Sequence, residues 1–280
     1  MVRAMSTGTV ATGVATRTVA TRANLLAFDL DKTIVRNDYT LPPEIKEAIH
    51  AARNAGHLIT VLTGRPQVAA LPFLQELDVH EYYSTNHGAL VTGRGEILRQ
   101  THIGNAHVKE LLEDYLEHPD IDFSCVVDDT LHVKDPSDPR WAWAHTLNRH
   151  LSVYDHSAQL NADKIVFTAE QLPDTIFERI RAVHPEFVQY QWEAGYLEVT
   201  APNADKGSAL ELLARELGVE RQAVIAFGDG PNDTTMLAYA GHGVSVGPHA
   251  HPDTRAAADE HVSAPEALGV AHWLRENLAL

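Results

Sequence analysis

The sequence lacks several features that mark common protein classes. It has a single cysteine, Cys125, so no intrachain disulfide can form and its cysteine usage does not indicate secretion. No run of about 18 consecutive apolar residues occurs, which excludes a membrane-spanning helix. Basic residues are scarce, with 22 Lys and Arg against 38 Asp and Glu. This acidic balance argues against nonspecific binding to nucleic acid or to anionic membranes, because both need a basic surface.

The first 23 residues show no periodic pattern of apolar residues. They contain Arg3, Arg17 and Arg22 but no acidic residue, and they lack the compact apolar stretch of a secretory signal. Their Arg, Ser and Thr content is also typical of a transit peptide, so that alternative stays open. Because no apolar periodicity is present with which to pack, we expect 1–23 to be a disordered N-terminal extension.

Short apolar runs alternate with amphipathic segments from Asn24 onward. The runs 25–28 and 58–62 predict buried parallel strands, and the segment 43–55 between them predicts a helix. The same alternation returns late in the chain, where a helix over 206–217 precedes a strand over 223–227. Strand–helix alternation favours crossover units and a parallel sheet. We therefore predict an α/β fold with a doubly wound parallel-sheet core built from segments 24–86 and 201–280.

The segment between these two parts has a different order of predicted helices and strands. Hairpin patterns at 88–98 and 188–200 mix there with helical patterns and further strands. The expected helices cover 105–117, 139–151 and 173–183, and the expected strands cover 124–127, 130–133 and 164–168. This mixture predicts an inserted α+β domain over 87–200 with an antiparallel sheet.

Polar side chains follow three of the predicted core strands. Asp29 and Asp31 follow the first strand, Thr63 follows the second and Asp229 follows the third. Ligands bind outside the carboxyl ends of the strands in open parallel sheets, so these residues should meet in one crevice. Three carboxylates crowded together are costly unless a cation neutralises them. An all-oxygen cluster of this kind suits Mg²⁺.

Four motifs in order resemble those of the haloacid dehalogenase (HAD) superfamily, and the pattern fits nearly the whole chain after residue 24. They are Asp29-Leu30-Asp31-Lys32-Thr33, Thr63 within Leu62-Thr63-Gly64-Arg65, Lys206-Gly207, and Gly228-Asp229-Gly230-Pro231-Asn232-Asp233. The segment 87–200 resembles the type IIB cap of the Cof-like hydrolases in size and composition, and Asn86-His87-Gly88-Ala89 resembles the entry to that cap. The resemblance implies a Rossmann-like HAD core with an α+β cap domain.

The resemblance also implies roles for individual residues. Asp29 would attack phosphorus and become an aspartyl phosphate, and Asp31 would act as general acid and then general base. The transferred phosphate would be bound by Thr63, Gly64, Lys206 and Asn232. Mg²⁺ would be held by Asp29, the backbone carbonyl of Asp31 and Asp229, with Asn232 and Asp233 completing the metal shell and orienting the lysine.

The implied function is that of a Mg²⁺-dependent phosphohydrolase. Its substrates would be phosphate monoesters of small metabolites such as a sugar phosphate, a nucleotide or a phosphorylated cofactor. Two alternatives remain: a phosphomutase of the same superfamily, and a metabolite-binding protein that has lost catalysis. We expect a cytoplasmic monomer or homodimer that binds neither nucleic acid nor membranes.

Three further signals are weaker. Lys32 occupies a position where many cap-bearing members have glycine, so a positive φ there would strain the backbone. The chain has 17 His, and the run 248–252 contains two of them, but a polar loop is favoured there over a second metal site. Aromatic residues of the cap, such as Trp141 and Trp192, are expected to be core residues or to line the crevice.

Overall fold

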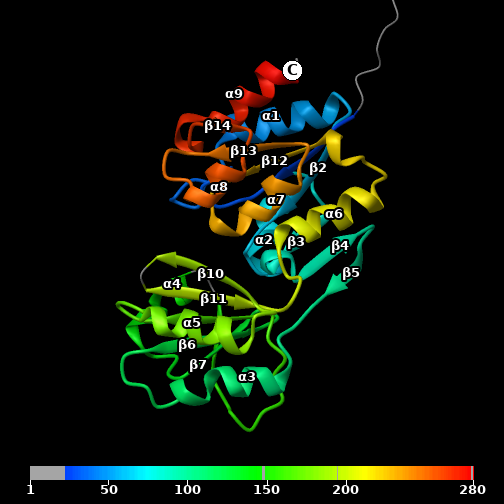
Figure 1. The fold of residues 1–280 in the computed structure, drawn as a ribbon. Helices are drawn as coiled ribbons and strands as arrows, with labels where there is room; N and C mark the ends of the chain where they lie inside the picture. The colour runs from blue at the N-terminus through cyan, green and yellow to red at the C-terminus, as the bar shows by residue number, and fades with distance from the viewer. Residues whose placement is uncertain (1–22, 147–148, 194, 279) are drawn as a thin grey trace, which may run out of the picture.

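The computed structural model describes residues 23–146, 149–193, 195–278 and 280. The extension expected over 1–23 therefore falls outside the described residues except for Ala23. Figure 1 shows two parts, a core that contains the first and last described elements and a cap that contains the middle of the chain.

An eight-stranded sheet forms the centre of the core, in the order β14-β13-β12-β1-β2-β3-β4-β5. The six strands from β14 to β3 are parallel, and β4 and β5 extend the sheet in antiparallel fashion. The strands are β1 (Leu25–Phe28), β2 (Leu58–Leu62), β3 (Tyr83–Thr85), β4 (Leu90–Gly93), β5 (Glu96–Gln100), β12 (Val224–Gly228), β13 (His242–Val246) and β14 (Glu260–Val262).

Helices cover both faces of this sheet because its strands are apolar on both sides. In β1, Leu26 and Phe28 face one apolar cluster while Leu25 and Ala27 face another. The first cluster lies against α1 (Pro43–Asn54), α2 (Gln67–Glu76) and α9 (Gly269–Asn277), and the second against α6 (Lys206–Glu216) and α7 (Thr234–Tyr239). The short helix α8 (Pro252–Ala257) packs beside α7.

The cap has its own six-stranded sheet, in the order β10-β11-β9-β6-β7-β8. Its elements are α3 (Asn105–Leu112), β6 (Asp122–Val127), β7 (Thr130–Val133), α4 (Ala142–Thr146), β8 (His150–Val153), β9 (Lys164–Thr168), α5 (Asp174–Val183), β10 (Val188–Glu193) and β11 (Tyr196–Thr200). Apolar residues of α3 and α5 pack on one face of this sheet. Trp141 and Ala144 pack on the other face.

Six single 3₁₀ turns complete the described elements: η1 (Asn86–Gly88), η2 (Glu113–Tyr115), η3 (Pro139–Trp141), η4 (Arg221–Ala223), η5 (Pro231–Asp233) and η6 (Pro265–Ala267). Within the described ranges, no helix is both long enough and apolar enough to cross a membrane.

The predicted fold class is confirmed, since a doubly wound α/β core carries an inserted α+β segment. The strands expected at 25–28 and 58–62 have those limits. The first helix ends at Asn54, and Gly56 takes a φ of +96° close behind it, the left-handed backbone that glycine adopts easily.

Three details differ from the sequence prediction. The sequence places the hairpin of β4 and β5 in the insert, but β4 pairs with β3 and so belongs to the core sheet. The segment with its own sheet starts after Gln100. The cap sheet is not wholly antiparallel, because β7 and β8 run parallel.

The third difference is the extent of the helix predicted over 139–151, whose last residues form a strand instead. Among the described residues of this range, η3 and the five-residue α4 cover 139–146, and β8 begins at His150. The chain 150–153 alternates polar and apolar residues, and its pairing with β7 outweighs the helix propensity of the preceding residues.

Candidate active site

A buried lysine joins two carboxylates at the carboxyl end of the core sheet. Lys206 is the first residue of α6, and its Nζ lies 2.5 Å from Asp29 Oδ1 and 2.5 Å from Asp233 Oδ1. Asp29 directly follows β1, whereas Asp233 ends the η5 turn after β12. Burial alone would lower the pKa of Lys206, but the two carboxylates raise it above its ordinary value. The two carboxylates therefore favour the charged form of Lys206, which lies against Asp29.

Asp233 also fixes the loop that follows β12. Its Oδ2 accepts hydrogen bonds from the backbone N–H groups of Asp229 and Gly230, both at 2.9 Å. The Asp229 carboxylate in turn accepts a hydrogen bond from Thr33 Oγ1 at 3.1 Å. Thr33 belongs to the loop after β1, so the two loops that flank the topological switch point of the sheet are joined.

Three carboxylates form an all-oxygen cluster in this crevice. Asp29, Asp229 and Asp233 each place an oxygen within 4.8 Å of the others. Burial raises the pKa of Asp29 well above its ordinary value against the attraction of Lys206, and burial followed by repulsion from Asp233 raises the pKa of Asp229 to about 7. A hard divalent cation would relieve this repulsion, so the donor set fits Mg²⁺.

Asp31 takes no part in that cluster through its side chain. Its carboxylate is bound by the Arg65 guanidinium, with Nε 2.8 Å from Oδ2 and Nη2 2.5 Å from Oδ1. The next residue, Lys32, has a φ of +60°, so the strain expected there is present, of the order of 1 kcal/mol or more. The Lys32 N–H donates to Val35 O at 2.8 Å, which closes the loop tightly.

The loop after β2 carries the predicted phosphate-binding residues. Thr63 is buried, and its Oγ1 accepts a hydrogen bond from the Arg65 N–H at 3.1 Å. Gly64 has His87 packed against it: a Cβ on Gly64 would lie 2.3 Å from His87 Cε1. Only glycine fits there without moving the ring.

His87 is buried at the joint between core and cap. Its Nδ1 lies 3.0 Å from Asn232 Nδ2, and its Nε2 lies 2.5 Å from Glu198 Oε2 on β11. Burial lowers the pKa of His87, which makes the neutral ring the form expected near pH 7. A neutral ring that accepts from Asn232 at Nδ1 carries its proton on Nε2, the nitrogen that lies beside Glu198.

Lys164 completes this set of contacts at the joint. Its Nζ lies 2.8 Å from Glu198 Oε1 and donates to the backbone carbonyl of Gly64 at 3.3 Å. Although burial would raise the pKa of Glu198, the neighbouring Lys164 and His87 lower it below its ordinary value. A cap lysine therefore reaches the loop that holds the predicted phosphate-binding residues.

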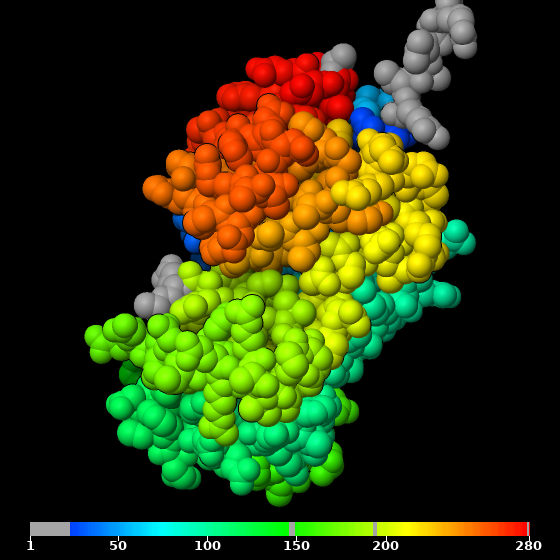
Figure 2. All heavy atoms as spheres, in the orientation of Figure 1, coloured from blue at the N-terminus to red at the C-terminus, as the bar shows by residue number. Residues whose placement is uncertain are grey.

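Two of the cap aromatics have different surroundings. Trp141 is only 1% exposed and its indole N–H donates to Asp122 Oδ2 at 3.2 Å, so it is a cap core residue and cannot line the crevice. Trp192 on β10 is 39% exposed and lies against Gly230, where a Cβ would come within 2.9 Å of its ring. Figure 2 shows the end of the cap around 190–200 lying against the core.

The comparisons with known proteins agree with this geometry. Residues 26–274 match the family described as haloacid dehalogenase-like hydrolase. The chain belongs to the haloacid dehalogenase-like hydrolases. The 5-amino-6-(5-phospho-D-ribitylamino)uracil phosphatase YitU of Bacillus subtilis is 27% identical over 93% of this chain and 99% of its own. The HMP-PP phosphatase of Serratia proteamaculans is 28% identical over 90% of this chain and 94% of its own.

Solved structures support the same fold. The HAD subclass IIB sugar phosphatase BT4131 superimposes with a TM-score of 0.80 over 92% of this chain and 100% of its own, at 23% identity. The core-plus-cap architecture is thus shared with that subclass. Family membership and the curated relatives together identify this HAD hydrolase as a phosphatase.

The structure gathers most of the residues named from the sequence. Asp29, Asp229, Asp233 and Lys206 lie together, while Asn232 directs its amide nitrogen at His87. The sequence reasoning assigned no role to Arg65, Lys164 or Glu198. Arg65 could have been noticed beside Thr63, but no pattern along the chain links Lys164 and Glu198 to the crevice.

Proposed function

We propose that this HAD phosphatase is Mg²⁺-dependent and hydrolyses phosphate monoesters of small metabolites through an aspartyl phosphate on Asp29. The observation that carries the proposal is the buried contact of Lys206 with Asp29 and Asp233 beside Asp229. With Mg²⁺ bound, these groups would supply an anionic nucleophile, a fixed cation and an oxygen-rich cluster in one place. That combination meets the needs of phosphoryl transfer.

Asp29 is the nucleophile in this proposal. Its carboxylate lies at the end of β1, is 5% exposed and is held at one oxygen by Lys206. Attack by the other oxygen would form the bond to phosphorus while the ester oxygen leaves, and water would later cleave the aspartyl phosphate. Asp29, Asp229 and Asp233 would hold the ion together with the backbone carbonyl of Asp31, and bound Mg²⁺ would supply positive charge beside nucleophile and phosphate.

Asp31 is the general acid and then the general base in this proposal. It would give a proton to the leaving oxygen and then take one from the attacking water. Arg65 binds the carboxylate at both oxygens and so fixes its orientation. Thr63, Gly64, Lys206 and Asn232 would contact the transferred phosphate.

The cap would select the remainder of the substrate. The catalytic groups contact only phosphate and the leaving oxygen, whereas Trp192 and Lys164 reach the crevice from β10 and β9. We take the two-segment core to be the catalytic domain and the cap to be the selectivity domain. The curated relatives act on phosphorylated small molecules by name, which supports the same substrate class here. We further propose a cytoplasmic monomer or homodimer.

The test is a panel of small phosphate esters with Mg²⁺, including para-nitrophenyl phosphate. We expect phosphate release that a chelator stops and that added Mg²⁺ restores. The variant Asp29→Asn should keep its circular dichroism spectrum and lose turnover by roughly 10³-fold or more. Acid-quenched protein should carry the phosphate on Asp29 by mass spectrometry. Phosphate on another residue, or full activity after exhaustive chelation, would contradict the proposal, and transfer to a second ester without release would indicate a mutase.

A further inference from the structure

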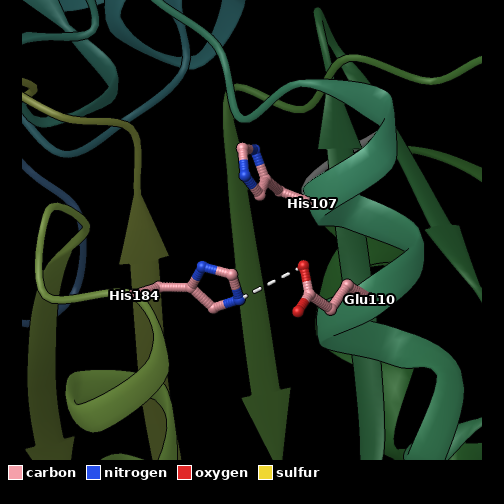
Figure 3. A group of neighbouring side chains, drawn as sticks. All are labelled: His107, Glu110 and His184. Carbon is pink, nitrogen blue, oxygen red and sulfur yellow. Dashed lines mark ion pairs between the residues drawn. The ribbon is translucent and has the colours of Figure 1, made fainter.

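Two histidines and a glutamate gather on the cap, outside the catalytic crevice. His107 and Glu110 lie one turn apart on α3, and His184 directly follows α5. Figure 3 shows the three side chains projecting into the space between the two helices. Each offers a ligand atom, and these atoms all lie within 4.8 Å of one another. His107 and Glu110 are exposed, while His184 is buried.

The spacing is close to that of a bound tetrahedral ion. Bonds of about 2.0–2.2 Å from a zinc ion to nitrogen and oxygen place neighbouring ligand atoms about 3.4 Å apart. His184 Nε2 lies 3.5 Å from Glu110 Oε2. His107 is an exposed side chain on the same face of α3 as Glu110, so a small rotation about its side-chain bonds can close the remaining distance.

The surroundings of His184 point to a ligand as well. Its other ring nitrogen, Nδ1, lies 3.6 Å from Glu186 Oε1. A metal-binding histidine commonly has a carboxylate near its second nitrogen, which fixes the tautomer and the ring orientation. The ring of Phe187 stacks on His184 at 5.1 Å and meets His107 edge-on at 5.4 Å between centroids. Phe187 therefore provides an apolar wall that shields two of the three ligands.

We propose that His107, Glu110 and His184 form a Zn²⁺ site with a fourth position open to water. Two imidazoles and one carboxylate match the ligand preference of zinc and differ from the all-oxygen cluster beside Asp29. The ion ties α3 to the end of α5, and both helices pack on the same face of the cap sheet. In Figure 1, α3 lies at the end of the cap that points away from the core. The site therefore stabilises the cap and takes no part in the phosphatase reaction.

The competing explanation is an ion pair without metal. His184 placed between Glu110 and Glu186 satisfies the same distances. That arrangement does not need His107, since the ring of His107 faces His184 only through an edge contact at 5.4 Å. Metal binding needs all three residues, so His107 separates the two explanations.

The experiment measures Zn²⁺ affinity by competition with a chromophoric chelator, on the full chain without a histidine tag and in excess Mg²⁺. We expect one tightly bound Zn²⁺, with affinity at least tenfold weaker in His107→Ala and in Glu110→Gln. Glu186→Gln should weaken binding by roughly tenfold or more, as is usual for such supporting carboxylates. Co²⁺ in place of Zn²⁺ should give the strong visible absorption of a tetrahedral site.

Two controls make the result specific. His80→Ala removes an exposed histidine that lies 2.8 Å from Asp78 Oδ1, a pair of potential ligands rather than three, and it should leave Zn²⁺ affinity unchanged. Asp229→Asn alters the catalytic cluster and should also leave it unchanged. Equal Zn²⁺ affinity in wild type and His107→Ala would overturn the proposal, and so would loss of binding in Asp229→Asn. Neither result bears on whether Asp29 is the nucleophile.

Discussion

The Arg65 guanidinium binds both carboxylate oxygens of Asp31. Its Nε lies 2.8 Å from Oδ2 and its Nη2 lies 2.5 Å from Oδ1. The guanidinium also lies over two rings, since its carbon is 4.5 Å from the Phe73 centroid and 5.5 Å from the Tyr39 centroid. This pair links the loop after β1 to the loop after β2. The second aspartate of the first motif is thereby oriented by a residue that follows the second motif.

We expect Arg65→Lys to lower kcat mainly for esters with a poor leaving group. Lysine keeps the charge but cannot bind both oxygens of Asp31, so the general acid would lose its orientation. The expected loss is roughly tenfold or more for an alkyl phosphate and much smaller for para-nitrophenyl phosphate, whose leaving group needs no proton. Steady-state kinetics with both esters provide the measurement. Equal losses on both would show that Arg65 acts on the phosphate itself.

Trp192→Ala should change substrate preference. Trp192 lies at the joint of cap and core, so its removal should lower kcat/KM more than tenfold for the best metabolite of the panel, about 1.4 kcal/mol of transition-state binding. Acetyl phosphate is too short to reach the ring and should be hydrolysed nearly as before. Trp143→Ala is the matched control, because Trp143 is 40% exposed against 39% for Trp192 but packs beside Trp141 in the cap. The idea fails if the two variants behave alike.

Gly64→Ala should lower activity because the new methyl group displaces the ring of His87. A methyl group on Gly64 would lie 2.3 Å from His87 Cε1, so the ring must move and break its contacts with Asn232 and Glu198. We expect a loss of kcat/KM of tenfold or more. The control Gly104→Ala has no atom within 4 Å of the new methyl group and should be neutral. Adding His87→Ala to Gly64→Ala should relieve the clash, so the double variant should be no more impaired than His87→Ala alone; additive losses would argue against this mechanism.

Asp163 should make the cap less stable as pH rises. Burial raises the pKa of Asp163 to about 6 against the attraction of His102, whereas the unfolded chain has the ordinary value near 3.9. The folded state thus holds a proton that the unfolded state releases, and stability falls between about pH 4 and pH 6. Urea unfolding at pH 4.5 and 7.5 should show a smaller drop for Asp163→Asn than for wild type.

An exposed aspartate, Asp155, serves as a control because its effect on stability should change with pH in the opposite direction. Hydrogen bonds from the Ser157 side chain and backbone lower the pKa of Asp155. Its contribution to stability is therefore present at neutral pH and is lost as pH falls, so Asp155→Asn should destabilise the protein slightly at pH 7.5. If Asp163→Asn and Asp155→Asn shift the pH profile in the same direction, the role given to Asp163 is wrong.

Much of the core could be predicted because its signals are local. The runs at 25–28 and 58–62 are apolar on both faces of a strand, and Asp29 and Asp229 stand where such strands end. The meeting of these ends follows from parallel-sheet topology alone. The position of the hairpin 90–100 could not be predicted in that way, because its pattern fits an edge of either sheet and only the pairing of β4 with β3 decides it.

The contacts between core and cap could not be predicted from sequence patterns, for a different reason. Lys164, Glu198 and His87 are far apart along the chain, and each has an ordinary surface or strand environment by sequence. Their contacts exist only because β9 and β11 are neighbours, which places Lys164 beside Glu198 and lets it reach the backbone of Gly64. His107 and Glu110 carry a partial signal, the one-turn spacing on a helix, but His184 lies beyond any local window.

The order of strands in the core sheet also bears on how the chain folds during synthesis. β1 lies between β2 and β12, so its second neighbour is the strand that begins at Val224, after the whole cap has been made. The cap is one continuous stretch and can fold as soon as it leaves the ribosome. In the first half of the core, one backbone edge of β1 stays unpaired until β12 has been made. We expect released chains that end at Thr200 to contain a protease-resistant cap and a protease-sensitive β1. Equal resistance of both parts in limited proteolysis would show that the core does not need its last strands to close.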